Sequence, residues 1–103
     1  RVNDPQIWAP NIFSPHRQDG NSDFFLIFAA ERTVNKINSL QVYDRWGTMV
    51  FRRDDILPND ETLGWDGRFR GKALNPAVFV WWAEVELADG QRILMKGDVT
   101  IAD

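Results

Sequence analysis

The strongest constraint on the fold is a two-residue alternation of apolar and polar side chains across residues 78–101. A period of two is typical of a β-strand with one buried face, because successive side chains point to opposite sides of the strand. Two runs show it, and their apolar positions are Phe79, Trp81, Ala83, Val85 and Leu87 in the first and Ile93, Met95, Gly97, Val99 and Ile101 in the second. We therefore expect an antiparallel hairpin that covers a core with one side.

The connection between the two runs must place both apolar faces on the same side of the hairpin. A two-residue turn would set these faces against each other, since a shift of one residue moves every side chain to the opposite face. A three-residue loop, 88–90, pairs Val85 with Ile93 and puts Gly90 where a bulge residue needs positive φ. We predict the three-residue loop.

The outer face of the hairpin is polar. The predicted register sets Glu86 across from Arg92 and Trp82 across from Lys96, and such cross-strand pairs contribute roughly 0.2–1 kcal/mol each. Glu84 and Glu86 share one face of one strand, whereas the two carboxylates of a glycosidase flank a cleft from opposite sides. We interpret the glutamates as part of a charged, solvent-facing surface.

The rest of the chain consists of short apolar runs separated by Pro, Gly, Asn and Asp, with no sustained helical spacing. Pro10 places the first strand at a sheet edge or bulge, because proline lacks the amide donor that a ladder needs. We predict strands at 6–13, 24–29, 37–44 and 48–53, one helical turn at 31–36, and mostly loop over 54–76. The class is all-β, and an immunoglobulin-like two-sheet β-sandwich of about seven short strands is favoured over a small barrel.

Length and composition limit the organisation and the partners. The 103 residues suit one domain, for which we expect 6–103, preceded by a linker, 1–5. Arg1 is no start methionine, which suggests a fragment of a longer protein. With 12 basic and 15 acidic residues and no basic cluster, we expect no nucleic-acid partner. No run is long enough for membrane insertion, and the absence of cysteine excludes disulfides.

Catalytic residues are not indicated. The single histidine, His16, shares one polar loop with Ser14 and Asp19. A catalytic triad is instead assembled from distant segments of a chain. We therefore expect a surface histidine, no enzymatic activity and no cofactor.

The same loop also carries acidic and amide side chains at a spacing found in metal-binding loops. Oxygen ligands at i, i+2 and i+4 begin a calcium loop of the EF-hand type, and the chain has them at Asp19, Asn21 and Asp23. Phe24 replaces the required glycine and Ala30 the bidentate glutamate, which excludes the complete motif. A weaker site that shares ligands with another loop stays open, although an Asx-type turn around Gly20 is the favoured interpretation.

Five tryptophans invite a carbohydrate-binding interpretation. Trp81 lies on the apolar face of the hairpin, and we expect Trp46 and Trp65 to pack the central loop onto the sandwich. Trp82 faces outward by the same alternation. The alternative function is therefore an immunoglobulin-like adhesin or a carbohydrate- or protein-binding module that uses Trp82 or an exposed Trp46.

Five short motifs follow one another along almost the whole chain. Their residues are Pro10, Asn11, Phe13 and Pro15; Asp19, Gly20 and Asp23; Tyr43, Arg45, Trp46 and Gly47; Trp65, Asp66, Gly67, Gly71 and Lys72; and Gly97. In this order and spacing the chain resembles the gliding-motility-associated C-terminal domain, also called the type B sorting domain of the type IX secretion system. Physically, the shared residues form turns and parts of the hydrophobic core. Gly47 and Gly67 are expected at tight turns, and Asp66 is expected to accept hydrogen bonds from backbone amides of its own loop.

The resemblance implies a C-terminal module that carries a passenger protein through the periplasm and across the outer membrane of Bacteroidota-type bacteria, to the cell surface or the extracellular space. It implies as partners the type IX translocon components and a PorP/SprF-type outer-membrane protein. Sheet edges and chain ends offer accessible backbone. Our hypothesis is that recognition uses the end of the last strand, at Lys96, Asp98, Thr100, Ile101 and Asp103.

Overall fold

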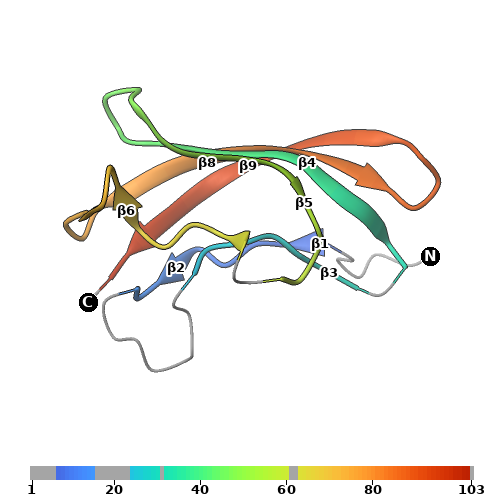
Figure 1. Ribbon diagram of the computed structural model, residues 1–103, viewed down its shortest axis with the longest axis horizontal. Coiled ribbons are helices and arrows are strands. Elements are labelled where there is room, and N and C mark those ends of the chain that lie inside the picture. The colour runs from blue at the N-terminus through green and yellow to red at the C-terminus, as the bar shows by residue number, and fades with distance from the viewer. Residues whose placement is uncertain (1–6, 16–23, 31, 61–62, 103) are drawn as a thin grey trace.

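The computed structural model describes residues 7–15, 24–30, 32–60 and 63–102, and these form nine β-strands in two layers (Figure 1). One five-stranded sheet has the order β2-β9-β8-β4-β5, and two strand pairs, β1-β3 and β6-β7, accompany it. The strands are β1 (Ile7–Trp8), β2 (Ile12–Phe13), β3 (Phe28–Ala29), β4 (Val34–Tyr43), β5 (Met49–Ile56), β6 (Arg68–Phe69), β7 (Lys72–Ala73), β8 (Val78–Leu87) and β9 (Arg92–Ile101).

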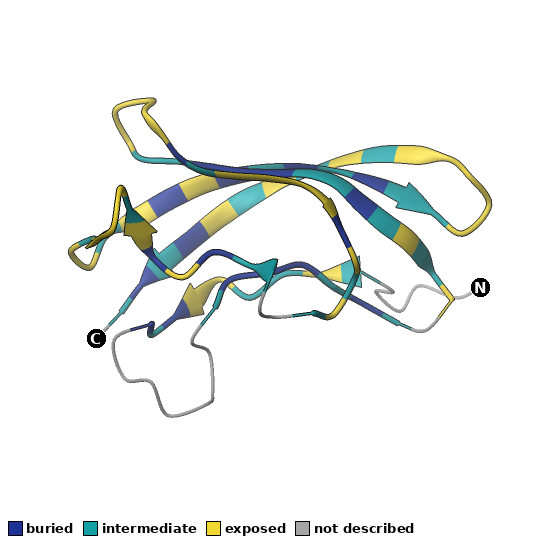
Figure 2. Cartoon of the chain, in the orientation of Figure 1, coloured by how far each residue is buried: buried dark blue, intermediate teal, exposed yellow. Residues whose placement is uncertain are grey.

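The long strands form the upper layer in Figure 1, and β1, β2 and β3 lie beneath them. Burial alternates along β8 and β9 (Figure 2), and their buried side chains belong to the hydrophobic core. The prediction of an all-β fold with packed sheets is confirmed. Three strands are ten residues long, however, where short strands were expected.

The predicted register of the last hairpin is confirmed. Val85 pairs with Ile93, and the amide of Leu87 donates to the carbonyl of Gln91 at 2.7 Å. The loop between them has three residues, and Gly90 adopts φ +90°. The requirement that both apolar faces point to the same side was therefore sufficient to define the length of this turn.

The helical turn predicted at 31–36 is wrong. Val34–Tyr43 is a single strand that pairs with β5 on one side and with β8 on the other. Ile37 and Leu40 are three residues apart, a spacing that resembles a helix. Both are nevertheless fully buried, and the pairing with β8 shifts register between Ile37 and Ser39, so that one irregularity brings both side chains to the core.

The strand predicted at 6–13 is divided at Pro10. β1 pairs with β3, whereas β2 pairs in parallel with the end of β9, so the chain changes sheets at the proline. The segment predicted as a strand at 24–29 is largely buried, but only Phe28–Ala29 is a strand. The side-chain amide of Asn59 satisfies the backbone of Ala29. Its Oδ1 accepts a hydrogen bond from the Ala29 amide and its Nδ2 donates one to the Ala29 carbonyl, each at 3.0 Å.

The segment predicted as mostly loop, 54–76, is partly ordered into strands. β5 continues to Ile56, and β6 and β7 form a small hairpin. Within the described ranges, no helix is long and apolar enough to cross a membrane. The proposed linker, 1–5, lies outside the residues that the structure describes.

Candidate functional site

The centre of the molecule is the side chain of Trp65, which is completely buried. Its ring lies 5.1 Å from that of Phe79, 5.5 Å from that of Phe13 and 6.4 Å from that of Phe51, measured between centroids. Phe51 and Phe79 are in β5 and β8 of the upper layer, and Phe13 is in β2, which is hydrogen-bonded to β9 but lies in the lower layer (Figure 1). These contacts therefore join both layers. The expectation that Trp65 packs the central segment onto the sandwich is confirmed.

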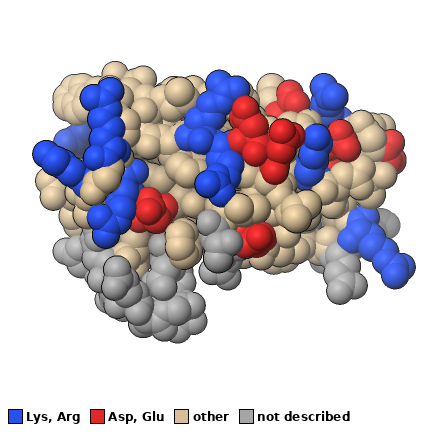
Figure 3. Space-filling view, viewed as in Figure 1, with Lys and Arg blue, Asp and Glu red and all other residues tan. Residues whose placement is uncertain are grey.

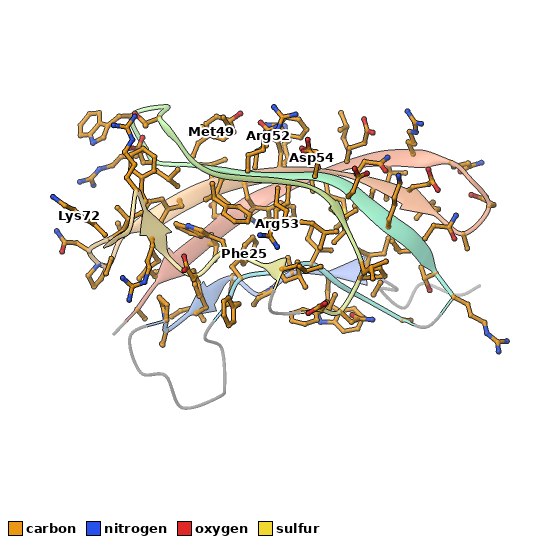
Figure 4. The ribbon with its side chains drawn as sticks, in the orientation of Figure 1. Phe25, Met49, Arg52, Arg53, Asp54 and Lys72 are labelled. Atoms are coloured by element: carbon orange, nitrogen blue, oxygen red, sulfur yellow. The ribbon has the colours of Figure 1, made fainter. Side chains whose placement is uncertain are left out.

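The backbone around Trp65 is tied to the segment that crosses the core. Phe25 and Trp65 exchange two amide-to-carbonyl hydrogen bonds of 2.8 and 2.9 Å. The indole Nε1 donates to the carbonyl of Arg68 at 3.0 Å, which satisfies the only polar group of a buried tryptophan. Figure 4 shows Phe25 between the two layers.

The turn after Trp65 brings together motif residues from three parts of the chain. Asp66 Oδ1 accepts a hydrogen bond from the amide of Arg68 at 3.1 Å, as predicted. Gly67 has φ +78°, and a Cβ there would lie 2.7 Å from Pro15 Cγ and 3.6 Å from Ile101 Cδ1. Glycine is required at this position by both conformation and space. Pro15, Gly67 and Ile101 therefore form one packed unit.

Gly97 serves a similar purpose in β9. Its partner in β8 is Trp81, and a Cβ at Gly97 would lie 3.2 Å from three atoms of the Trp81 indole. The absence of a side chain lets the large ring lie flat against the strand. Much of the motif thus has a packing role.

The turn at 44–48 differs from this buried unit. Asp44 Oδ1 accepts hydrogen bonds from the amides of Trp46 and Thr48, each at 2.9 Å, and Gly47 has φ +88°. Trp46 is nevertheless 80% exposed, and the guanidinium of Arg45 lies 5.4 Å from its ring centroid. The expectation that Trp46 packs onto the sandwich is wrong, because the turn extends beyond the strands that would cover it.

Two shallow grooves lie near exposed aromatic rings. One is lined by Trp82, Leu94, Met95 and Lys96 on the outer side of β8 and β9. The other lies between the 44–48 turn and the segment that leads into β8, with Trp46 and Asn75 among its lining. Basic side chains gather at the end of the molecule that carries β6 (Figure 3), where the exposed residues include Arg68, Arg70 and Lys72.

The proposed recognition residues are not all equally accessible. The side chains of Lys96 and Asp98 are exposed, and Thr100 is half-buried. Ile101 is 1% exposed, so its side chain belongs to the core. Asp103 lies outside the described residues.

On the outer face of the hairpin, the side-chain partners of the glutamates differ from those that the sequence suggested. Glu86 stands across from Arg92 as predicted. Its carboxylate instead accepts a hydrogen bond from Asn35 at 3.2 Å, and that of Glu84 accepts one from Asn38 at 3.0 Å. Among the described residues the ion pairs are Lys36–Asp55, Arg52–Asp54 and Arg68–Asp66.

The weak metal site that the sequence left open would use Asp19, Asn21 and Asp23. Throughout 7–15, 24–30, 32–60 and 63–102, no three of His, Cys, Asp and Glu converge. The loop with His16, Asp19, Gly20, Asn21 and Asp23 lies outside these ranges, so the weak metal candidate stays a prediction.

The fold and the buried motif define a small two-layer β-domain whose characteristic residues serve mainly its own packing. The chain belongs to the CHU_C type IX secretion signal domain family, whose model matches residues 7–101. Membership identifies it as a signal domain that interacts with the type IX secretion machinery, for export across the outer membrane to the cell surface or the medium. No curated protein and no solved structure matches the chain.

Proposed function

We propose that this domain is a non-catalytic sorting signal that directs an attached passenger protein through the type IX secretion system to the cell surface or the medium. The family match over residues 7–101 carries the proposal. The distribution of the motif residues supports it, because the fully buried Trp65 and Gly67 serve the fold. Recognition of a folded domain must then use what remains on the surface.

The recognition surface in this proposal is the last strand and its end, read by a translocon component or a PorP/SprF-type outer-membrane protein. Lys96 and Asp98 expose their side chains, and Thr100 is partly accessible. Ile101 contributes by anchoring the strand against Gly67. Asp103 is included from its position in the sequence and lies outside the described residues.

A reporter with a signal peptide for the periplasm, fused ahead of this domain and expressed in a bacterium with a type IX system, tests the proposal. We expect the fusion to reach the cell surface or the medium. A charge exchange, Lys96→Asp with Asp98→Lys, should reduce export by about tenfold, which corresponds to about 1.4 kcal/mol of lost binding. Glu84→Gln is the matched control on the neighbouring strand. Equal export with and without the domain would refute the sorting function.

A second candidate is a binding module for carbohydrate, favoured by the exposure of Trp46. Trp46 is 80% exposed beside a groove that also contains Asp44, Arg45 and Asn75. Aromatic surface with a few polar groups is what a sugar ring requires. Saturable fluorescence changes on titration with sugars, lost in Trp46→Ala and kept in Trp82→Ala, would support this function.

A further inference from the structure

Strand β9 has an open edge over most of its length. It pairs with β8 on one side from Arg92 to Thr100. On the other side β2 reaches it only at Thr100 and Ile101. Within the described part of the chain, no strand covers residues 92–99 on that side.

The direction of the backbone groups on this edge follows from the hydrogen bonds at its two ends. The amide of Leu87 donates to the carbonyl of Gln91, and the amide of Ile101 donates to the carbonyl of Ala77. Hydrogen-bonded pairs recur at every second residue of an antiparallel ladder, so the odd-numbered residues of β9 face β8. The residues whose amides and carbonyls face away from β8 are Arg92, Leu94, Lys96 and Asp98.

The opposite edge of the same sheet is irregular, whereas the edge at β9 is regular. In β5, Arg52 and Asp54 form an ion pair on the outer side while Arg53 points toward the other layer (Figure 4). The hydrogen bond from Arg52 lowers the pKa of Asp54, and Asp55 has φ +55°, which interrupts regular strand geometry. Such an irregularity hinders pairing with another strand. The β8–β9 register, by contrast, is continuous from Arg92 to Thr100.

The side chains along the open edge have a definite chemical character. Leu94 is 74% exposed and borders the groove formed with Trp82 and Met95. On either side of it stand Arg92 and Lys96, and no described residue forms an ion pair with either. The nearby carboxylates of β8 bond to β4 instead, at Asn35 and Asn38.

We propose that the type IX machinery recognises this domain by adding an extended strand to the open edge of β9 between Arg92 and Asp98. The inference rests on the proposed sorting function and specifies its recognition mode. An added strand forms hydrogen bonds with the four outward-facing residues, while its side chains provide selectivity. Charge complementarity requires acidic residues beside Arg92 and Lys96, with an apolar residue beside Leu94.

A proline on the edge separates backbone recognition from side-chain recognition. Leu94→Pro removes an amide that faces away from β8, so no ladder bond within the domain is lost. Leu94→Ala removes the same side chain and keeps the amide. In the reporter fusion we expect Leu94→Pro to reduce export by tenfold or more and Leu94→Ala to reduce it less, with closely similar midpoints of thermal unfolding.

Export of the Leu94→Pro fusion at the level of Leu94→Ala would overturn strand addition. If both were exported while the charge exchange at Lys96 and Asp98 was not, the sorting function would stand and the recognition mode would fall. Should Leu94→Pro unfold, Arg92→Glu with Lys96→Glu takes its place, because like charges would repel an acidic strand. Normal export of that variant contradicts the proposal.

A second copy of the chain is the other strand that this edge could accept. Sedimentation velocity of the unfused domain across a range of concentrations distinguishes it. We expect a monomer. A dimer that Leu94→Pro converts to a monomer would assign the edge to self-association and overturn the proposal.

Discussion

Trp65 and Trp46 belong to two motifs of the same family, yet they lie in opposite environments. Trp65 is completely buried among Phe13, Phe51 and Phe79 from both layers. Trp46 is 80% exposed at the end of a turn, where the neighbouring Arg45 stacks on its ring. A motif residue can therefore serve folding at one site and remain available to a partner at another, and stability measurements separate the two.

The largest effect is expected from Trp65→Ala. Removing the ring leaves a cavity at the junction of both layers and deletes the bond to the Arg68 carbonyl, so the free energy of unfolding should fall by about 3–5 kcal/mol. Urea denaturation measures it, with Trp65→Phe as a milder control. A loss below about 1 kcal/mol would contradict the central role of this side chain.

Gly67→Ala should have the next largest effect. The added Cβ would lie 2.7 Å from Pro15 Cγ at φ +78°, and overpacking of this kind costs about 1–3 kcal/mol. Gly47→Ala is the matched control, because Gly47 has φ +88° with nothing within 4 Å of a Cβ. The backbone cost of about 1 kcal/mol is then common to both variants. Equal losses of stability would show that contact with Pro15 is unimportant.

Asp44→Ala should destabilise the exposed turn more modestly. The carboxylate accepts two backbone hydrogen bonds of 2.9 Å, and their loss from an exposed site should cost about 1 kcal/mol. Asp44→Asn retains an acceptor oxygen and should recover much of that loss. Thermal unfolding of the three proteins provides the measurement, and identical midpoints would disprove the role of Asp44 in the turn.

The smallest effect is expected from Trp46→Ala. A side chain so exposed contributes little to the fold, and the free energy of unfolding should change by less than about 0.5 kcal/mol. Equilibrium denaturation next to Trp65→Ala sharpens the contrast between the two tryptophans. Destabilisation comparable to that of Trp65→Ala would mean that the turn folds back onto the domain in solution.

Sequence reasoning failed where local spacing conflicted with sheet pairing. Residues 31–36 resembled a helical turn, yet Val34–Tyr43 is paired along both sides, and this long-range pairing overrides local preference. The role of Asn59 was missed as well. Its side chain completes the hydrogen bonding of Ala29, which is distant in the chain, so no short pattern marks it.

The recognition surface was anticipated only in outline. The sheet edges and the end of the last strand were expected to be accessible, and Lys96 and Asp98 are exposed. Which backbone groups face outward depends on the hydrogen bonds that Leu87 and Ile101 make with their partners. Ile101 was proposed from its position at the chain end, but its side chain is buried against the Gly67 turn.

By itself the sequence determined the all-β class, the register of the last hairpin and the tight turns at Gly47 and Gly67. A period of two leaves a single turn length that aligns both apolar faces, so local information was sufficient. Only the tertiary structure decided that Trp46 is exposed and that β9 has an open edge. These properties depend on which distant segments of the chain cover a given strand. Side-chain packing between the layers determines which segments do so.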